Sequence, residues 1–156
     1  MASERISLSC IDAAFRYLGY RPRSEFEIKV RLRKRGFDEL SIEKVLLNLR
    51  EQGLVDDAAF ARFWRDNRES FSPRSRAMLR RELKLKGIDP CVIAEVAASI
   101  NEEVSAYKAA QKIIKKLALM DYGSFHRKLG SFLRRRGFNS EVSQHTINQL
   151  WQERQD

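Results

Sequence analysis

The sequence predicts an all-α fold, an elongated solenoid-like array of three tandem three-helix repeats. Apolar residues recur at the helical spacing i, i+3, i+4, i+7, and alternation typical of strands is nearly absent. The 156-residue chain contains only three prolines. A short motif also returns with a period of about 50 residues, which is typical of tandem arrays. We place the three repeats at residues 7–53, 54–100 and 101–153.

The recurring motif is an apolar residue, a basic stretch, a glycine and a second apolar residue. It occurs at Leu32–Phe37, Leu83–Ile88 and Leu133–Phe138. Apolar residues also match four and eight positions before the glycine, and ten and thirteen positions after it. The first two copies share a Pro-Arg-Ser sequence upstream of the motif. We interpret each glycine as the residue that ends the second helix of its repeat.

Three helices are predicted in the first repeat. The first covers about residues 7–18, with an apolar face of Ile11, Ala14, Phe15 and Leu18. The second runs from Ser24 to Arg35, and Glu27 stands three residues after Ser24, the spacing of a capping box. The third covers about residues 40–52 and is expected to bury Ile42, Val45, Leu46 and Leu49.

The second repeat opens with Asp57 as the predicted N-cap of a helix, because Ser, Thr, Asp and Asn are preferred there. Phe60, Phe63 and Trp64 would supply the apolar face of this helix. Ser75 is the predicted cap of the next helix, which ends at Gly87. Pro90 suits the first turn of the sixth helix, where its missing N–H costs nothing.

The third repeat is predicted to begin with one long helix, capped by Asn101 and continuing to about residue 119. Its inward stripe would be Ala106, Ala110, Ile113 and Leu117. The eighth helix is predicted over residues 124–136 and the ninth over 140–153. The ninth helix is expected to bury Ile147, Leu150 and Trp151.

The bulk composition narrows the class of protein. Of all residues 43% are hydrophobic, yet no run approaches the ~18 apolar residues of a transmembrane helix. Residues 1–5 have no signal-peptide pattern. Cys10 and Cys91 lack a CxxC partner and are expected to be reduced, small, buried residues. We therefore expect a cytoplasmic protein without membrane contact.

Positive charge is concentrated in one helix of each repeat. Residues 21–37, 74–86 and 126–136 each carry a net charge of +5, whereas the whole chain carries +9. The remaining residues are therefore acidic overall, at −6. A basic helix in every repeat suits a polyanion, or the acidic wall of a groove in a protein.

The candidate contact residues are the cations of these three helices. We select Arg33, Arg35, Arg74, Arg76, Arg80, Arg81, Lys84, Lys86, Arg134 and Arg136. A purely structural explanation also exists, since each cation in the last turn of a helix stabilises it by ~0.3–1 kcal/mol. That explanation suits Arg74, Arg76, Arg80 and Arg81 less well, because we place them in the first half of their helix, where the helix dipole disfavours cations.

The junction of the first two repeats carries the most specific sequence. The stretch Gly53–Ala61, followed by Trp64, resembles a signature of the RecX family of regulatory proteins, which modulate the RecA recombinase. The matching positions, expected to be structural, are Gly53, Leu54, Asp56, Asp57, Phe60, Ala61 and Trp64. Residues 18–32 and 73–88 resemble two further family segments. Around Pro73 the chain departs from the family, with Ser72, Ala77 and Met78 at positions that usually hold other residues.

The resemblance implies a non-enzymatic cytoplasmic protein that needs no cofactor. It further implies binding to RecA nucleoprotein filaments within their helical groove, with inhibition of filament growth, strand exchange and ATP hydrolysis. Weak, salt-sensitive binding to single- and double-stranded DNA would accompany this activity. We expect the chain to act as a monomer.

Catalytic and metal sites are not indicated by the residues themselves. Asp56 and Asp57 could be a carboxylate dyad, but an apolar stripe begins three residues later, which favours a helix cap. His126 and His145 have no partners at metal-ligand spacing. The chain lacks a GxxxxGK[ST] loop for ATP. Three classes remain open: a modulator of a DNA-bound filament, a stand-alone DNA-binding helical-repeat protein, and a helical scaffold.

Overall fold

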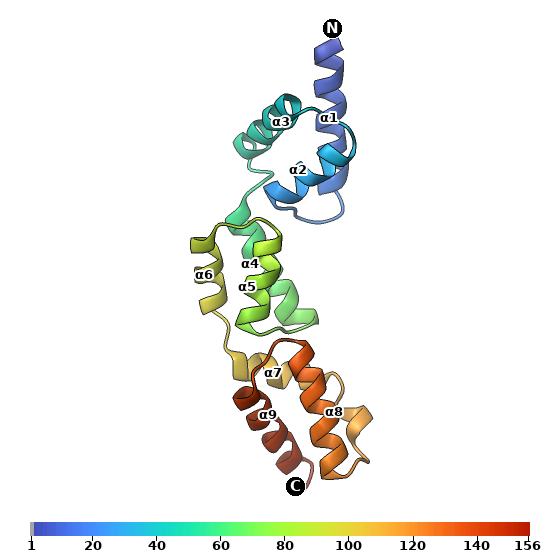
Figure 1. The fold of residues 1–156 in the computed structure, drawn as a ribbon, viewed down its shortest axis with the longest axis vertical. Helices are drawn as coiled ribbons and strands as arrows, with labels where there is room; N and C mark the ends of the chain where they lie inside the picture. The colour runs from blue at the N-terminus through green and yellow to red at the C-terminus, as the bar shows by residue number, and fades with distance from the viewer. Residues whose placement is uncertain (1) are drawn as a thin grey trace. The chain divides into compact units, whose positions relative to one another are not determined.

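The computed structural model describes residues 2–156, and within that range every regular element is a helix (Figure 1). The all-α prediction is confirmed. The α-helices are α1 (Ala2–Leu18), α2 (Glu25–Lys34), α3 (Glu39–Glu51), α4 (Asp57–Phe71), α5 (Arg76–Leu85), α6 (Pro90–Ala98), α7 (Glu102–Gln111), α8 (Tyr122–Arg135) and α9 (Ser140–Glu153). A short 3-10 helix, η1 (Ile114–Leu117), follows α7.

The chain forms two compact units. The first contains the chain up to Trp64 together with residues 83–93, and the second contains residues 65–82 and 94–156. Helices α4, α5 and α6 therefore each contribute residues to both units. The division into three repeats at residues 53–54 and 100–101 stays a prediction.

The core of the first unit is formed by α1, α2 and α3. Its buried residues are Cys10, Ala13, Ala14, Ile28, Leu32, Ile42, Val45, Leu46, Leu49 and Val55. The predicted buried face of α3 is confirmed. The predicted face of α1 is partly wrong, because Phe15 is 41% exposed. The small residues Cys10, Ala13 and Ala14 lie against the core instead, and small side chains let a helix approach its neighbours closely.

Helix starts in the first unit follow the predicted capping rules with one correction. Ser24 and Glu27 form the capping box of α2. The cap of α4 is Asp56, whose Oδ1 accepts the N–H of Ala59 at 3.1 Å. Asp57 was predicted for that role, but its Oδ1 accepts the N–H of Glu25 at 2.9 Å. Asp57 therefore joins the start of α4 to the start of α2.

The core of the second unit is formed by α7, η1, α8 and α9. Its buried residues are Ala106, Ala109, Ala110, Leu117, Phe125, Leu129, Phe132, Leu133, Phe138, Ile147 and Leu150. Trp151 is half-buried against this cluster. The caps Asn101 and Asn139 accept backbone N–H groups at the starts of α7 and α9.

The long helix predicted for residues 101–119 is wrong. Helix α7 ends at Gln111, and Ile113, with φ −117° and ψ −6°, lies between the end of α7 and the start of η1. Two adjacent β-branched residues, Ile113 and Ile114, disfavour the helix at this point. The break allows the alanine face of α7 and the side chain of Leu117 to reach one core. Arg154 then fixes the end of this segment by donating to the Met120 carbonyl at 2.7 Å.

The two cysteines differ in environment. Cys10 is buried and Cys91 is exposed, so the prediction that both are buried is wrong for Cys91. Cys91 is the second residue of α6 and lies on the outer side of its first turn. No helix in the described part of the chain is long and apolar enough to cross a membrane.

The repeated glycines have the left-handed backbone expected of helix ends. The φ angles of Gly36, Gly87 and Gly137 are 86°, 72° and 91°. A Cβ added at Gly36 would meet nothing within 4 Å. At Gly87 it would lie 2.5 Å from the Phe26 Cβ, and at Gly137 2.8 Å from the Met78 Cβ. Only the second and third glycines therefore also permit close packing of two helices.

Alanine substitution separates these two roles of glycine. We expect Gly36→Ala to destabilise by about 1 kcal/mol, the cost of a left-handed alanine. Gly87→Ala and Gly137→Ala should each cost about 1–3 kcal/mol more, since a packed neighbour must move. Urea unfolding of the three variants measures the difference. Equal losses would show that the close contacts have no energetic consequence.

Candidate functional site

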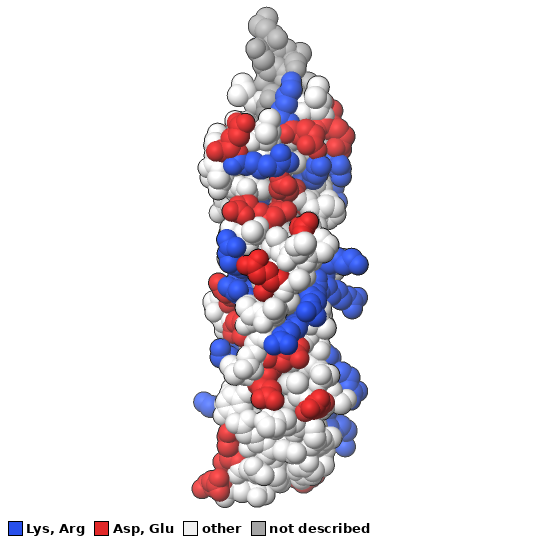
Figure 2. Space-filling view, turned by 90° about the vertical axis from the view of Figure 1, so that its left-hand side faces the viewer, with Lys and Arg blue, Asp and Glu red and all other residues white. Residues whose placement is uncertain are grey.

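Five of the candidate cations are exposed and free of internal partners. In the described chain the side chains of Arg35, Arg80, Arg81, Lys84 and Arg134 form no ion pair or hydrogen bond. Figure 2 shows a band of adjoining Lys and Arg side chains on one face of the molecule. Such cations are available to an anionic partner without the loss of an internal contact.

Two further candidates are exposed but engaged. Arg33 forms a forked ion pair with Glu39, with Nε–Oε1 2.5 Å and Nη2–Oε2 3.0 Å. This pair raises the pKa of Arg33 and lowers that of Glu39, in each case chiefly through the hydrogen bond between them. The Nε of Arg76 donates to the Ile100 carbonyl at 2.8 Å. Arg76 therefore holds the end of α6 as well as facing solvent.

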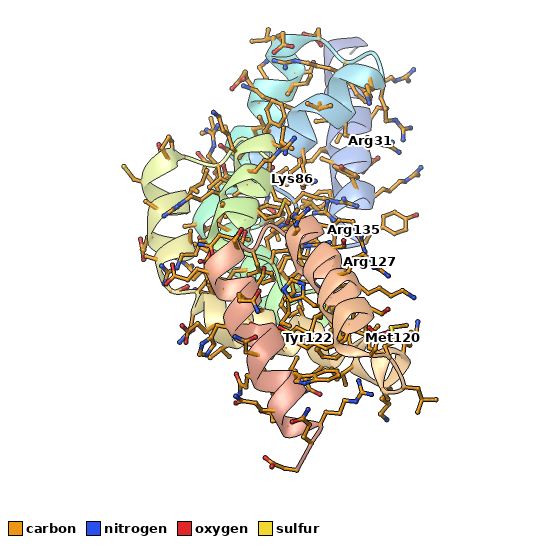
Figure 3. All side chains as sticks on the ribbon, turned by 60° about the horizontal axis from the view of Figure 1, so that its bottom comes forward. Arg31, Lys86, Met120, Tyr122, Arg127 and Arg135 are labelled. Atoms are coloured by element: carbon orange, nitrogen blue, oxygen red, sulfur yellow. The ribbon has the colours of Figure 1, made fainter. Side chains whose placement is uncertain are left out.

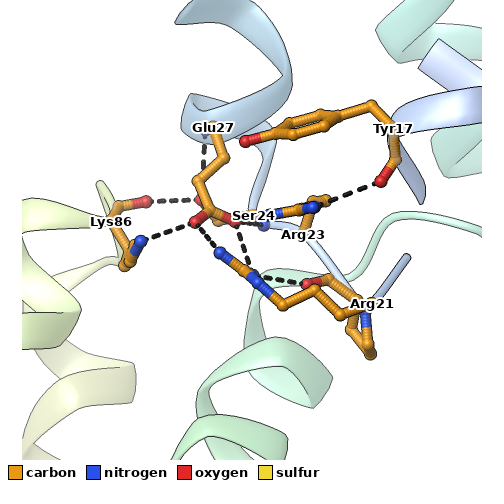
Figure 4. Close-up of polar contacts among 7 residues, drawn as sticks. Tyr17, Arg21, Arg23, Ser24, Glu27 and Lys86 are labelled. Atoms are coloured by element: carbon orange, nitrogen blue, oxygen red, sulfur yellow. Dashed lines mark hydrogen bonds and ion pairs between the residues drawn. The ribbon is translucent and has the colours of Figure 1, made fainter. Parts of the chain in front are cut away.

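Lys86 belongs to a polar network inside the first unit (Figure 4). Its Nζ lies 2.7 Å from Oε1 of Glu27, a carboxylate that is only 8% exposed. Arg21 pairs with the same carboxylate at 2.6 Å. The Lys86 carbonyl accepts the hydroxyl of Ser24 at 2.7 Å. Lys86 thus joins the end of α5 to the start of α2.

The electrostatics of this network favour the charged form of Glu27. Burial raises the pKa of Glu27, but hydrogen bonds from Arg21 and Lys86 outweigh burial. The pKa of this carboxyl therefore lies below its ordinary value. The centre of the Trp64 ring lies 4.9 Å from the Lys86 Nζ and 5.4 Å from the Arg21 guanidinium carbon. Trp64 thus contacts two cations of the network.

An equivalent junction in the second unit joins the start of α5 to the end of α8. The N–H of Ser75 donates to the Arg136 carbonyl at 3.1 Å, and Gly137 follows. Ser75 caps α5 by accepting the N–H of Met78 at 3.1 Å. Met78 stands three residues after the capping serine, where the first junction has Glu27. The second junction therefore lacks the carboxylate that neutralises the first.

Arg74 and Arg136 remain cationic at this second junction. The Arg136 guanidinium carbon lies 3.5 Å from the centre of the Phe132 ring. Arg74 is 3.8 Å from its nearest carboxylate, on Glu82, and its buried Nε has no hydrogen-bond partner in the described chain. Burial lowers the pKa of both arginines, and the charge of Arg74 lowers the pKa of Arg136 further. Both side chains are only partly accessible to a partner.

The described residues contain no group of three or more His, Cys, Asp or Glu side chains arranged to hold a metal ion. His126 contacts Gln144 through Nε2 at 2.7 Å. The Cys10 thiol is buried, and burial, followed by the charge of Asp38, raises its pKa. A raised pKa disfavours the reactive thiolate.

Sequence comparison identifies the family. Models of the first and second three-helix domains of RecX match residues 10–49 and 56–96. The regulatory protein RecX of Chlorobium phaeobacteroides is 35% identical over 140 residues, covering 90% of this chain and 92% of its own. That of Prosthecochloris aestuarii is 35% identical over 150 residues, covering 95% and 97%. This chain belongs to the RecX family.

Solved RecX structures share the fold. The crystal structure of RecX from Lactobacillus salivarius superposes with a TM-score of 0.74 at 20% identity, covering 94% of this chain and 97% of its own. A second crystal structure of a regulatory protein RecX gives 0.75 at 25% identity, covering 94% and 75%. The tandem three-helix organisation of the RecX family therefore applies to this chain.

The residues of the RecX-like signature end one helix, start another or are partly or fully buried in the first unit, apart from the exposed Leu54. Gly53 has φ +68° and ends α3. Phe60 and Ala61 are buried, at 2% and 0% exposure. Asp56 and Asp57 bind backbone N–H groups, as described above, while Leu54 remains 47% exposed. Both carboxylates therefore bind backbone N–H groups at the starts of helices, Asp56 at α4 and Asp57 at α2.

The cations selected from the sequence omit a group of basic residues in the second unit. Lys116, Arg127, Lys128 and Arg135 lie around one groove. The selected cations lie one and three positions before each repeated glycine or in the middle repeat, and these four lie at neither kind of position. The density of Lys and Arg in residues 112–136 was the available signal.

The Glu27 network predicts a pH-dependent contribution to stability. Because its folded pKa is lowered, Glu27 stabilises the fold fully above its ordinary pKa of 4.5 and loses this effect as pH falls further. Glu27→Gln should cost about 1–3 kcal/mol at pH 7, since two partly buried cations lose their carboxylate. Denaturant unfolding at pH 7 and at acidic pH measures both effects.

Glu39→Gln is the matched control for this experiment. It removes one carboxylate from the exposed pair with Arg33, and such pairs contribute little to stability because solvent screens them. A loss at Glu27 no larger than that at Glu39 would contradict the structural importance of the network.

Proposed function

We propose that this RecX-family chain binds RecA–DNA filaments within their helical groove and inhibits filament growth, recombination and ATP hydrolysis by RecA. Two observations support the proposal. The chain belongs to a family of regulatory proteins, and its excess positive charge lies on one helix of each repeat. We further propose a cytoplasmic, non-enzymatic, monomeric protein that needs no cofactor.

Helix α5 carries the proposal most directly. Arg80, Arg81 and Lys84 are exposed, and within residues 2–156 none of their side chains has an internal partner. Side chains three or four residues apart lie on neighbouring parts of a helix surface. Stabilisation of the helix end accounts for Lys84 in the last turn, but not for Arg80 and Arg81. A partner with acidic or phosphate groups accounts for all three.

The remaining proposed contacts have different degrees of availability. Arg35 and Arg134 are exposed without partners in the described chain, and Arg33 and Arg76 are exposed but engaged. Lys86, Arg74 and Arg136 are half-buried at the two junctions. We rank these last three as the weakest contributors to partner binding, because their contacts already stabilise the fold.

Charge reversal on α5 tests the proposal. The triple variant Arg80→Glu, Arg81→Glu, Lys84→Glu should raise the concentration needed to inhibit RecA ATPase on single-stranded DNA by about tenfold or more. Inhibition is measured by titration of RecA bound to single-stranded DNA, and folding by circular dichroism.

The control carries the same change in net charge at other exposed cations. Lys44→Glu, Arg62→Glu, Lys108→Glu alters α3, α4 and α7 and leaves the second helices intact. We expect it to inhibit RecA nearly as well as the unmodified protein. Full inhibition by a folded α5 variant would exclude α5 as the contact surface.

A stand-alone DNA-binding protein is the second candidate, supported by the net charge of +9 and the pI of about 9.9. Weak affinity for free single-stranded DNA should fall by about 0.7 log units per phosphate neutralised for each tenfold increase in salt. Fluorescence anisotropy over a salt series measures the slope. Tight DNA binding without any effect on RecA would favour this candidate over filament regulation.

A further inference from the structure

A groove of about 550 Å³ lies in the second unit between α8 and the segment that contains η1. Its floor includes Ile113, Leu117 and Met120. Four cations line its sides: Lys116, Arg127, Lys128 and Arg135. In Figure 3, Arg127 and Arg135 lie at different points along α8, and Met120 lies near the start of this helix.

The charge around this groove is one-sided. No acidic side chain lines it. Residues 112–136 contain eight Lys or Arg residues and one acid, Asp121, a net charge of +7. The carboxylate of Asp121 caps α8 by accepting the N–H of Ser124 at 3.0 Å. The four lining cations have no ion pair within the described residues, so the groove favours an anionic ligand.

The base of the groove is apolar, so it favours a ligand that also has apolar groups. Leu117 is part of the core, and Met120 is half-buried beside it. Leu119, between these two residues in sequence, is 99% exposed. Arg154 donates to the Met120 carbonyl at 2.7 Å and thereby holds this segment in place without a ligand. The groove is therefore preformed, with aliphatic and thioether surface at its base.

A nucleic acid fits this floor poorly. Bases of single strands commonly stack on open aromatic rings. Phe132 is the aromatic residue of the groove, but it is 7% exposed, and the guanidinium of Arg136 lies 3.5 Å from its ring centre. Flexible methionine and leucine surfaces instead suit the aliphatic side chains of a peptide.

We propose that this groove binds an acidic peptide segment of a partner protein. One or two large aliphatic side chains of the peptide would contact Ile113, Leu117 and Met120, which line the groove. Flanking Asp and Glu residues would pair with the lining cations on either side. This surface differs from the α5 cations of the proposed function and can act without them.

Binding of a designed peptide tests the inference. The probe is a fluorescein-labelled peptide of about ten residues, with a central leucine pair flanked by Asp and Glu, measured by anisotropy at about 0.15 M salt. Arg127→Glu, Lys128→Glu should weaken binding by about tenfold or more, through lost attraction and new repulsion. Met120→Ser should weaken it by about threefold or more, through lost apolar contact.

Lys108→Glu is the matched control, an exposed charge reversal on α7 outside the groove. It should change affinity by less than about twofold, because distant surface charges are screened at this salt concentration. Circular dichroism of every variant confirms folding. The peptide-binding measurement contains neither RecA nor DNA, so failure of the peptide to bind leaves the proposed function intact.

Three outcomes would overturn the inference. Equal binding of a peptide with serines in place of the leucine pair would show attraction by charge alone. Oligothymidylate that binds more tightly than the peptide, and loses affinity in the Arg127→Glu, Lys128→Glu variant, would make the groove a nucleic-acid site. Vesicles with anionic lipid that bind in preference to the peptide, and depend on Leu119, would make it a membrane-contact surface.

Discussion

The packing of the repeats depends on one contact, made twice, between the end of one second helix and the start of another. In the first unit the Ser24 hydroxyl donates to the Lys86 carbonyl, and in the second the Ser75 N–H donates to the Arg136 carbonyl. Carbonyls at the end of a helix lack partners within it, so each contact satisfies a group that would otherwise need water. The glycine after each carbonyl removes the Cβ that would block the approach.

This contact gives the capping serine of one repeat and the glycine of the next a shared role. A helix cap at Ser24 or Ser75 requires only a short polar side chain, and a helix end requires only a left-handed residue. The helix start at the serine must also pack against the helix end at the glycine, and this places a further constraint on both residues. Gly36 has the left-handed backbone that ends a helix, but no other helix packs closely against it.

The junctions in the first and second units differ in charge because the residue three positions after the capping serine differs. Glu27 pairs with both Lys86 and Arg21 at the first junction, whereas Met78 stands at the matching position of the second. Arg136 then packs on Phe132, and burial and neighbouring charges lower its pKa. Residues that match in a sequence repeat therefore have unequal surroundings, and the repeat alone does not reveal which cations face a partner.

Local patterns predicted the features that depend on neighbouring residues in sequence. The capping box at Ser24 and Glu27, the buried face of α3 and the glycine ends follow from spacing alone. Features that depend on packing were missed. Asp57 binds the N–H of Glu25 from another helix, α7 breaks where the core accommodates both its alanine face and Leu117, and Phe15 is displaced by smaller residues.

The candidate contacts can be ranked by the free energy that each cation loses when it leaves its internal partners to bind another molecule. Arg80, Arg81 and Lys84 give up no internal partner in the described chain, so a new contact offsets only lost side-chain freedom. Arg33 must leave an exposed ion pair, which contributes little to stability because solvent screens it. Removing Lys86 from Glu27 would leave a buried carboxylate short of one cation, at a cost of about 1–3 kcal/mol. Basic residues with the same place in the repeat therefore divide between partner binding and fold stability.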